Sequence, residues 1–336
     1  MVTTVTSRAP AGRAGAGAWP AYLLVLLVLG AAIYAFSPRP NPPFPPTVIH
    51  SDRILINALA QRGNRIIAVG EQGHVLLADN ASGPWHEGRV QPQRGSTLTQ
   101  VQYIGEHTAL AVGHDGWVLR STDDGENWQE VAFDTERSDP LLGIAGPYDG
   151  KLFAFGGFGR FVMSTDDGKT WQKVVSEAAG DHHLNAMTRM ADGALLLVGE
   201  RGLMLRSADN GQTWKALPQV YTGSFYGALA LPGQRVLVYG MRGNAYVSRD
   251  LGKSWQKSIV PEEVSLLGGA VTAKGEIVLV GEGNTVLVSR DSGDRFVVAS
   301  QGERRTLAAV LPVSGNEWLT GGEAGLSVKR ATGAKS

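Results

Sequence analysis

The chain carries the stretch Ser121-Thr122-Asp123-Asp124-Gly125-Glu126-Asn127-Trp128, and its pattern, S-x-D-x-G-x-x-W, returns four times further along. The later copies occupy residues 164–171, 207–214, 248–255 and 289–296, the last with Phe296 in place of Trp. The aromatic position recurs at intervals of 43, 43, 41 and 41 residues. A fixed period of this length is typical of a repeat architecture, in which every unit forms one supersecondary element.

A second repeated element precedes each of these stretches, an apolar segment that ends in G-x-x-G. Its leading glycines are Gly70, Gly113, Gly156, Gly199, Gly240, Gly281 and Gly322. Their intervals of 43, 43, 43, 41, 41 and 41 residues define seven units. The first and last units lack a full S-x-D-x-G-x-x-W copy, although Trp85 keeps the aromatic position in the first.

Each unit reads as four short strands, which in the second unit are expected at 99–104, 109–113, 117–121 and 128–133. Short apolar or alternating runs between Gly, Asp and Asn turns are strand signals. Seven such units predict an all-β, seven-bladed β-propeller with four-stranded blades. The last unit lacks an outer strand, and we expect Thr47-Val48-Ile49-His50 to pair there and close the ring, removing an exposed edge.

The repeated turn motif is expected to be structural. Its aspartate can accept hydrogen bonds from the turn backbone, its glycine takes a positive φ, and its aromatic ring fills the space between sheets. The residues assigned to this role are Asp123, Trp128, Asp166, Trp171, Asp209, Trp214, Asp250, Trp255, Asp291 and Phe296.

The N-terminal region predicts a membrane segment. Residues 1–18 contain Arg8 and Arg13 and no acidic side chain, and residues 19–36 form an uncharged apolar run. A helix of that length extends roughly 27 Å, enough for the hydrocarbon core. The basic tail favours a cytoplasmic N-terminus and a chain exported into the periplasm. An uncleaved anchor is preferred, and a signal peptide cleaved after Ala35 is the alternative.

The domain organisation follows from these segments. We expect a cytoplasmic tail at 1–18, a transmembrane anchor at 19–36, a linker at 37–46 and a propeller at 47–336. The linker contains six prolines in ten residues and should be an extended spacer of roughly 30 Å.

Composition excludes several functions. The 31 basic and 31 acidic side chains give no net field for nucleic acid, and without cysteine there is no disulfide, thiol nucleophile or cysteine metal site. No phosphate loop is found, because the G-x-x-G elements lack a following helix and lysine. His182 and His183 are adjacent and should point to opposite sides of an extended segment, which argues against a shared metal. No cofactor is expected.

The motif S-x-D-x-G-x-x-W resembles the Asp-box, or BNR repeat. With V-G-x-x-G before it, as in Val198–Gly202 leading to Ser207–Trp214, residues 47–336 are similar to the photosystem II assembly/stability-factor family. The resemblance implies a seven-bladed propeller that acts as a non-enzymatic assembly factor for membrane proteins. Similar bacterial proteins are associated with RND-type exporters, and the anchor makes an inner-membrane partner the better expectation for this chain.

Sialidases also carry this repeat, but their F/Y-R-I-P segment does not occur in this sequence. Glycosidases need two carboxylates outside the structural turns. Glu200 and Glu282 recur at one turn position in several blades, which favours a turn role over a unique acid–base pair. We therefore expect no enzyme, and no catalytic residue is assigned.

The G-x-x-G turns and the connections between blades should share one propeller face, opposite the S-x-D-x-G-x-x-W turns. Their side chains vary while the framework repeats, so specificity is expected there. Arg, Tyr, Phe and Met suit a protein interface. The partner-binding candidates are Phe158, Arg160, His182, His183, Glu200, Arg201, Tyr221, Phe225, Met241, Arg242, Arg304 and Arg305.

The sequence thus favours a membrane-anchored periplasmic propeller that assists an inner-membrane protein complex, with an RND-type exporter as the specific expectation. The alternative is an envelope propeller that binds or cleaves glycans, which predicts paired carboxylates or convergent arginines over the central channel. A third hypothesis is a scaffold that links envelope proteins through several surfaces.

Overall fold

The structure is a computed structural model that describes residues 17–37, 49–314 and 317–330. The chain divides into two compact units, Met1–Val48 and Ile49–Ser336. In the first unit the apolar run forms one helix, α1 (Trp19–Phe36), with Pro20 in its first turn and no buried residue. A proline is tolerated there because the first backbone N–H groups of a helix have no intrahelical partner.

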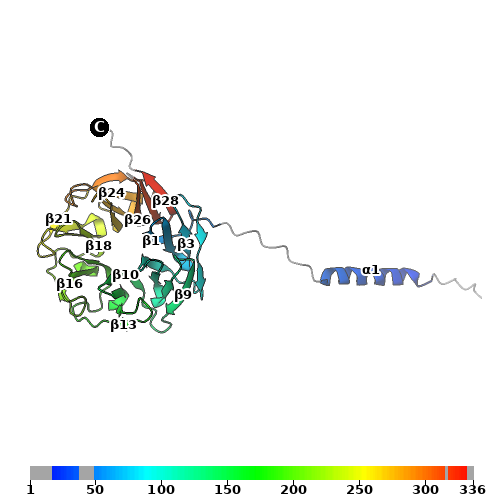
Figure 1. Cartoon of the computed structure of the whole chain (residues 1–336). Coiled ribbons are helices and arrows are strands. Elements are labelled where there is room, and N and C mark those ends of the chain that lie inside the picture. The colour runs from blue at the N-terminus through cyan, green and yellow to red at the C-terminus, as the bar shows by residue number, and fades with distance from the viewer. Residues whose placement is uncertain (1–16, 38–48, 315–316, 331–336) are drawn as a thin grey trace, which may run out of the picture. The chain divides into compact units, whose positions relative to one another are not determined.

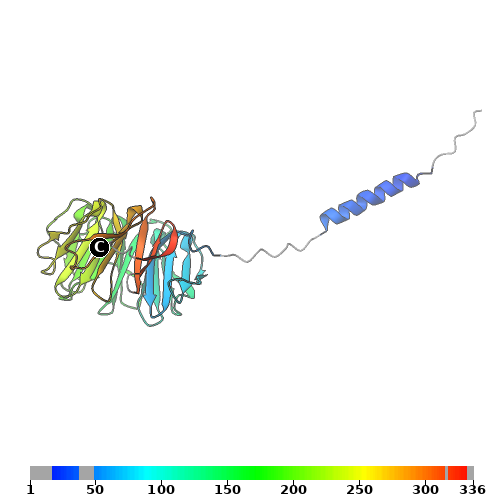
Figure 2. The ribbon, with the colours of Figure 1, turned by 90° about the horizontal axis from the view of Figure 1, so that it is seen from above.

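The second unit is a seven-bladed β-propeller, as predicted, with its sheets arranged around a central axis (Figure 1, Figure 2). Six of the seven sheets run in sequence order from the axis outward, and in the other, that of blade 2, β6 (Leu98–Tyr103) is innermost. Blade 1 contains β1 (Ile56–Arg62), β2 (Arg65–Gly70), β3 (Val75–Ala78) and β4 (His86–Glu87). Blade 2 contains β6 (Leu98–Tyr103), β7 (Ala109–Gly113), β8 (Val118–Ser121) and β9 (Asn127–Ala132). Blade 3 contains β10 (Leu141–Tyr148), β11 (Lys151–Gly156), β12 (Phe161–Ser164) and β13 (Gln172–Lys173).

The remaining blades repeat this order. Blade 4 contains β14 (Leu184–Arg189), β15 (Leu195–Gly199), β16 (Met204–Ser207) and β17 (Lys215–Ala216), and blade 5 contains β18 (Phe225–Leu231), β19 (Arg235–Gly240), β20 (Ala245–Ser248) and β21 (Gln256–Lys257). Blade 6 contains β22 (Leu266–Val271), β23 (Ile277–Gly281), β24 (Thr285–Ser289) and β25 (Val297–Ser300). Blade 7 contains β26 (Leu307–Ser314), β27 (Glu317–Gly322) and β28 (Gly325–Arg330). The strands expected in the second unit each lie within one residue of the observed bounds.

Two blades depart from the four-stranded pattern. In blade 2, β5 (Arg89–Gln91) pairs in parallel with β9 and makes a fifth strand. In blade 7, three strands are found in the described part of the chain. Of the predicted closing strand, Thr47 and Val48 lie outside the described residues, and Ile49 and His50 are not in a strand. The adjoining Ser51 carbonyl nevertheless accepts a hydrogen bond of 2.8 Å from the Leu326 N–H, at the outer edge of β28.

The core lies between the blades. The second strand of each sheet is buried on both faces because a neighbouring blade covers each side, and β7, β15 and β23 are buried at every residue. This explains why these segments are continuously apolar instead of alternating. Adjacent blades share the resulting clusters, as where Val75 and Leu77 of blade 1 pack with Trp117 and Trp128 of blade 2.

The G-x-x-G elements, with Asn284 in place of the second glycine in the sixth, form a recurring turn between the second and third strands. They are the short 3-10 segments η1 (Glu71–Gly73), η2 (His114–Gly116), η3 (Gly157–Gly159), η4 (Glu200–Gly202), η5 (Met241–Gly243) and η6 (Glu282–Asn284), with a tight turn at Gly322–Gly325 in blade 7. In blade 4 the Glu200 N–H donates to the carbonyl of His183, which precedes the innermost strand, at 2.9 Å. An added Cβ on Gly199 would lie 2.2 Å from that same oxygen. The first glycine is therefore required by close backbone approach, and the equivalent bond is present in all seven blades.

The five S-x-D-x-G-x-x-W turns share the hydrogen bonds of their serine and aspartate, and they lie at the opposite end of the sheets in blades 2 to 6. In the second blade the Ser121 hydroxyl donates to Asp123 at 2.8 Å and accepts from the Gly125 N–H at 3.0 Å. Asp123 also accepts from the Asn127 N–H at 2.9 Å, and the Trp128 indole N–H donates to the Gly125 carbonyl at 2.7 Å. These bonds join the two ends of the turn and hold the indole against the core.

The aspartates of these turns are stabilised as anions. The backbone and hydroxyl of Thr170 donate to Asp166 and lower its pKa to about 2, and the Ser254 hydroxyl and backbone do the same to Asp250. Hydrogen bonding from Thr213 lowers the pKa of Asp209 still further. Hydrogen bonds to the charged form favour ionisation without any catalytic role.

Candidate interaction face

The turns between second and third strands lie at the same end of the sheets as the connections between blades, because the strands alternate in direction. The two are joined by backbone hydrogen bonds. The Gly159 N–H donates to the His182 carbonyl at 3.0 Å, and the Gly243 N–H donates to that of Val264 at 2.6 Å. We call this end of the propeller the connection face, and the S-x-D-x-G-x-x-W turns lie at the other end.

Three candidate residues occupy the tips of adjacent turns on the connection face. Phe158, Arg201 and Arg242, in blades 3, 4 and 5, have φ values of 54°, 53° and 52°. Positive φ is uncommon for side chains of this size and is maintained here by the turn around it. All three are exposed. Within the described ranges, neither the Arg201 nor the Arg242 guanidinium has a hydrogen bond or ion pair.

Two further arginines lie in the connection between blades 6 and 7. Arg304 is exposed, and its side chain has no partner among the residues that the structure describes. Arg305 pairs with Glu303 at 3.2 Å, and both side chains are more than half exposed. Such an exposed pair contributes little stability. Among the twelve candidates, the exposed guanidinium groups without a partner in the described residues are therefore those of Arg201, Arg242 and Arg304.

His182, His183 and Tyr221 are partly buried and contact other residues of the face. The His183 ring packs edge-on against Phe158 with 5.0 Å between centroids, while His182 Nδ1 lies 3.2 Å from the Ala179 carbonyl. The Tyr221 hydroxyl donates to the Met241 carbonyl at 3.4 Å. These contacts link blade 3 to blade 4 and blade 4 to blade 5.

Of the twelve candidates, Phe225 needs correction, and Arg160 and Glu200 have partners within the chain. Phe225 is fully buried and packs against Tyr221 and Tyr246, so it does not reach the surface. Arg160 donates to the Asp134 carboxylate at 2.9 Å and to the Asp139 carbonyl at 3.0 Å, and so holds the preceding connection. The Glu200 carboxylate accepts from the His183 N–H at 3.1 Å.

The glutamates of the G-x-x-G turns share this structural contact. Each accepts a backbone N–H just before the innermost strand of its blade. The four pairs are Glu71 with Leu55, Glu200 with His183, Glu282 with Ser265 and Glu323 with Thr306. This is the turn role that their recurrence in the sequence predicts.

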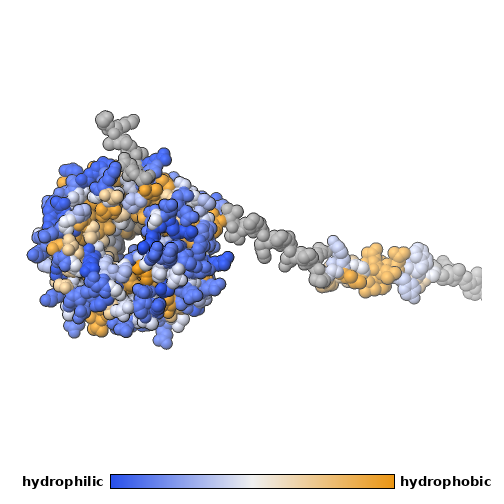
Figure 3. All heavy atoms as spheres, in the orientation of Figure 1, coloured by the Kyte–Doolittle hydropathy of each residue, from blue (hydrophilic) through white to orange (hydrophobic). Residues whose placement is uncertain are grey.

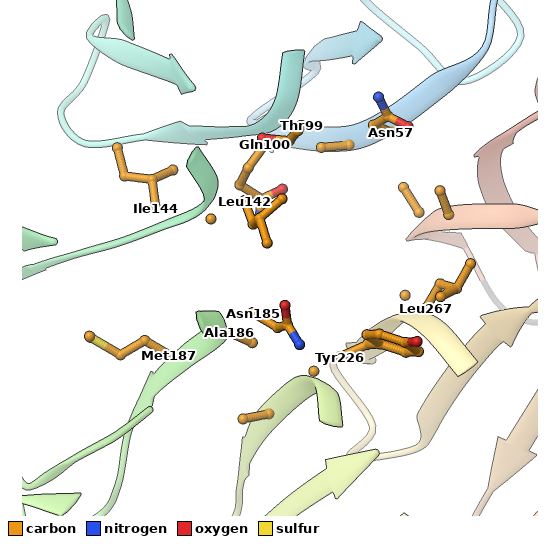
Figure 4. Close-up of a pocket in the computed structure, with 18 of the residues that line it drawn as sticks. Asn57, Thr99, Gln100, Leu142, Ile144, Asn185, Ala186, Met187, Tyr226 and Leu267 are labelled. Carbon is orange, nitrogen blue, oxygen red and sulfur yellow. The ribbon is translucent and has the colours of Figure 1, made fainter. Parts of the chain in front are cut away.

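The central channel holds a cavity of about 280 Å³, which the innermost strands of all seven blades line. Figure 3 shows the ring hollowed at its middle, and Figure 4 shows Asn57, Thr99, Gln100, Asn185 and Tyr226 around the space. No charged side chain contributes to this lining as the structure describes it. The paired carboxylates or arginines that a glycosidase would place over the channel are not found there.

Sequence reasoning missed a structural role for three of these polar residues. The side-chain amides of Asn57 and Asn185 and the Thr99 hydroxyl donate across to the next blade, to the carbonyls of Leu98, Phe225 and Leu141 at 2.8, 2.7 and 2.7 Å. Each is the second residue of its innermost strand, where the pairing with the next strand is irregular. This irregularity turns the side chain toward the neighbouring blade. A polar residue directly after the apolar first residue of these three innermost strands was the available signal.

No group of three His, Asp or Glu side chains able to hold a metal is found in the described residues. The helix α1 is long and apolar enough to cross a membrane, a property that a signal sequence shares. Its middle part is strongly hydrophobic (Figure 3).

Comparison with known proteins places the chain among propellers. A family profile described as the DUF6242 beta propeller domain matches residues 97–228. A solved structure described as YCF48 bound to D1 peptide has a TM-score of 0.68 and 17% identity, and the match covers 87% of this chain and 97% of that one. YCF48 from Cyanidioschyzon merolae gives 0.68 and 14%, with 84% and 97% covered. No curated protein sequence gives a significant match.

The WD40 beta propeller domain of Doa1 is as similar in shape, with a TM-score of 0.67, 12% identity, and coverage of 84% of this chain and 94% of that one. Because YCF48 and a WD40 propeller match this chain equally well, these similarities show the fold alone.

Proposed function

We propose that this chain is a non-catalytic, membrane-anchored propeller that recognises a membrane protein complex through its connection face. The observation that carries the proposal is the row of turn tips at Phe158, Arg201 and Arg242, which hold exposed side chains at positive φ. Unpaired guanidinium groups beside an exposed aromatic ring suit a protein interface. The YCF48 propeller of similar fold has been solved with a D1 peptide bound, which supports a peptide-binding role for this shape.

In this proposal α1 is an uncleaved anchor in a bacterial inner membrane, the propeller lies in the periplasm, and the partner is an inner-membrane complex such as an RND-type exporter. The resemblance of the repeats supports this choice of partner. Tethering raises the local concentration of the propeller beside its partner, so that a weak face contact is effective. The proline-rich segment 37–46, which after Ser37 lies outside the described residues, is proposed as the spacer.

Reversing the charge of the three unpaired arginines tests the proposal. In affinity purification of the full-length protein from gently solubilised native membranes, Arg201→Glu/Arg242→Glu/Arg304→Glu should lower recovery of the co-purifying complex at least about tenfold. Arginines are over-represented among interface residues whose loss costs about 2 kcal/mol or more.

The matched control reverses three exposed cations of the S-x-D-x-G-x-x-W turns, as Lys169→Glu/Lys253→Glu/Arg295→Glu. This variant changes net charge by the same amount at the opposite end of the propeller, and it should recover the complex like the wild type. Equal recovery by both triple variants would remove the connection face as the binding surface.

A further inference from the structure

A small pocket opens beside the most unusual of the turn tips. It has a volume of about 190 Å³ and lies between the connection from blade 2 to blade 3 and the outer strands of blade 3. Phe158 and Val162 contribute apolar surface, and Asp134, Arg137, Asp139 and Lys173 contribute charged groups. An engineered cavity of about 150 Å³ in another protein takes up a benzene ring, so this space is sufficient for one large apolar side chain.

Phe158 is the only large apolar residue at its position in the described turns. The equivalent tips in five other blades are Gln72, Asp115, Arg201, Arg242 and Gly283. Phe158 is 59% exposed despite its apolar ring, and its backbone has a φ of 54°. Its ring packs edge-on against His183, which fixes it beside the pocket. An exposed aromatic ring on a strained backbone is a feature that folding alone does not favour.

The charges around the pocket leave one cation without a partner. Asp134 is paired with Arg160 at 2.9 Å, and Asp139 with Arg137 at 3.1 Å. The backbone N–H groups of Arg137 and Glu136 also donate to Asp134 and, with Arg160, lower its pKa. Both carboxylates are thus satisfied from within the chain. The exposed ammonium group of Lys173, in the outer strand β13, has no ion pair in the described part of the protein.

We propose that this pocket binds an extended segment of the partner protein, taking one large apolar side chain against Phe158 and an adjacent carboxylate on Lys173. The inference rests on the proposed function and deepens it by naming the chemistry recognised. Apolar contact would supply burial, and the unpaired ammonium would select an acidic neighbour over a basic one. The turn holds Phe158 and the strand β13 holds Lys173, so binding would not require a loop to become ordered.

The test uses the full-length protein in detergent micelles and fluorescein-labelled peptides with Gly-Ser flanks around a central pair of residues. Fluorescence anisotropy compares Phe-Asp, Ala-Asp, Phe-Asn and Phe-Lys at the centre. The Phe-Asp probe should bind at least about tenfold more tightly than the Ala-Asp and Phe-Lys probes, by the magnitude of an interface hot spot. Phe158→Gly should reduce Phe-Asp binding by a similar factor. It should keep the wild-type Tm, because glycine relieves the positive φ.

Charge exchange makes the test specific. Lys173→Glu should lose the Phe-Asp probe and gain the Phe-Lys probe. Lys257→Glu is the control, because Lys257 pairs with Tyr246 in blade 5 as Lys173 pairs with Val162 in blade 3. Equal binding of all four probes, or unchanged preference in Lys173→Glu, would overturn the pocket assignment. If the pocket assignment failed but the arginine triple variant still lost the co-purifying complex, the proposed function would stand without the pocket.

Discussion

Replacing Trp128 with alanine is expected to lower the free energy of unfolding by about 3–5 kcal/mol. The indole is 1% exposed, donates to the Gly125 carbonyl at 2.7 Å and fills the space between blades 1 and 2. Its removal leaves a cavity among Val75, Leu77 and Leu119 that β-strands fixed in two sheets cannot close. Chemical denaturation of the full-length protein, followed by circular dichroism, measures the change.

Trp171→Ala is the matched comparison because this indole occupies the same motif position in blade 3. It is only half-buried, and its N–H donates to the Gly168 carbonyl at a longer 3.2 Å. The loss should therefore be clearly smaller than for Trp128→Ala. A loss below about 1 kcal/mol for Trp128→Ala, or equal losses for both variants, would contradict the assigned role of the indole in the core.

Gly202→Ala is expected to destabilise the propeller by about 2–5 kcal/mol, from positive φ and overpacking together. Gly202 has a φ of 71°, and an added Cβ would lie 1.7 Å from the Tyr221 carbonyl oxygen. This oxygen belongs to the connection between blades 4 and 5, so relief of the contact would displace Tyr221 from the connection face. Thermal unfolding of the full-length protein measures the loss.

Gly233→Ala separates the two causes. Gly233 has a nearly equal φ of 77°, in the turn between β18 and β19, but nothing lies within 4 Å of its added Cβ. Its substitution should show the backbone cost alone, about 1–2 kcal/mol. If Gly202→Ala and Gly233→Ala lower the stability equally, the second glycine of G-x-x-G is not required by the close approach of the connection.

Periodicity was sufficient to predict the propeller, its blade number and the sharing of one face by turns and connections, because all three follow from strand order. It also contained an unused signal about Phe225. The residues at its position in the other blades are Ile56, Leu98, Leu141, Leu184, Leu266 and Leu307, every one apolar and buried. Comparison of the seven units at this position predicts a core residue.

Arg160 and Arg201 show what periodicity could not predict. Arg160 directly follows the G-x-x-G turn of blade 3, and Arg201 lies at the tip of the turn in blade 4. Arg160 is held by Asp134 and the Asp139 carbonyl, whereas Arg201 is unpaired in the described residues. The difference arises from the connection between blades 2 and 3, whose length and sequence do not repeat. Asp134 and Asp139 line the same pocket as Lys173, and they are paired with Arg160 and Arg137.

The contact of the chain with the edge strand β28 is a second feature that periodicity did not predict. Ser51 accepts from Leu326 at the position where a closing strand would begin, and Ile49 packs with Leu319 and Leu326. Of the predicted strand Thr47–His50, the two described residues do not form a strand. The unassigned apolar segment therefore predicted that the chain approaches blade 7, but it did not predict the hydrogen bonds made there.

The most direct test of the central claim compares the two ends of the same blades. A photo-crosslinking amino acid is placed at position 201 or 242 on the connection face, and at 212 or 253 in the opposite turns of those blades, all exposed. After irradiation of cells, the account predicts crosslinks to an integral membrane protein from 201 and 242, and none from 212 and 253. Crosslinks from the opposite turns alone, or equal yields from both ends, would contradict recognition through the connection face.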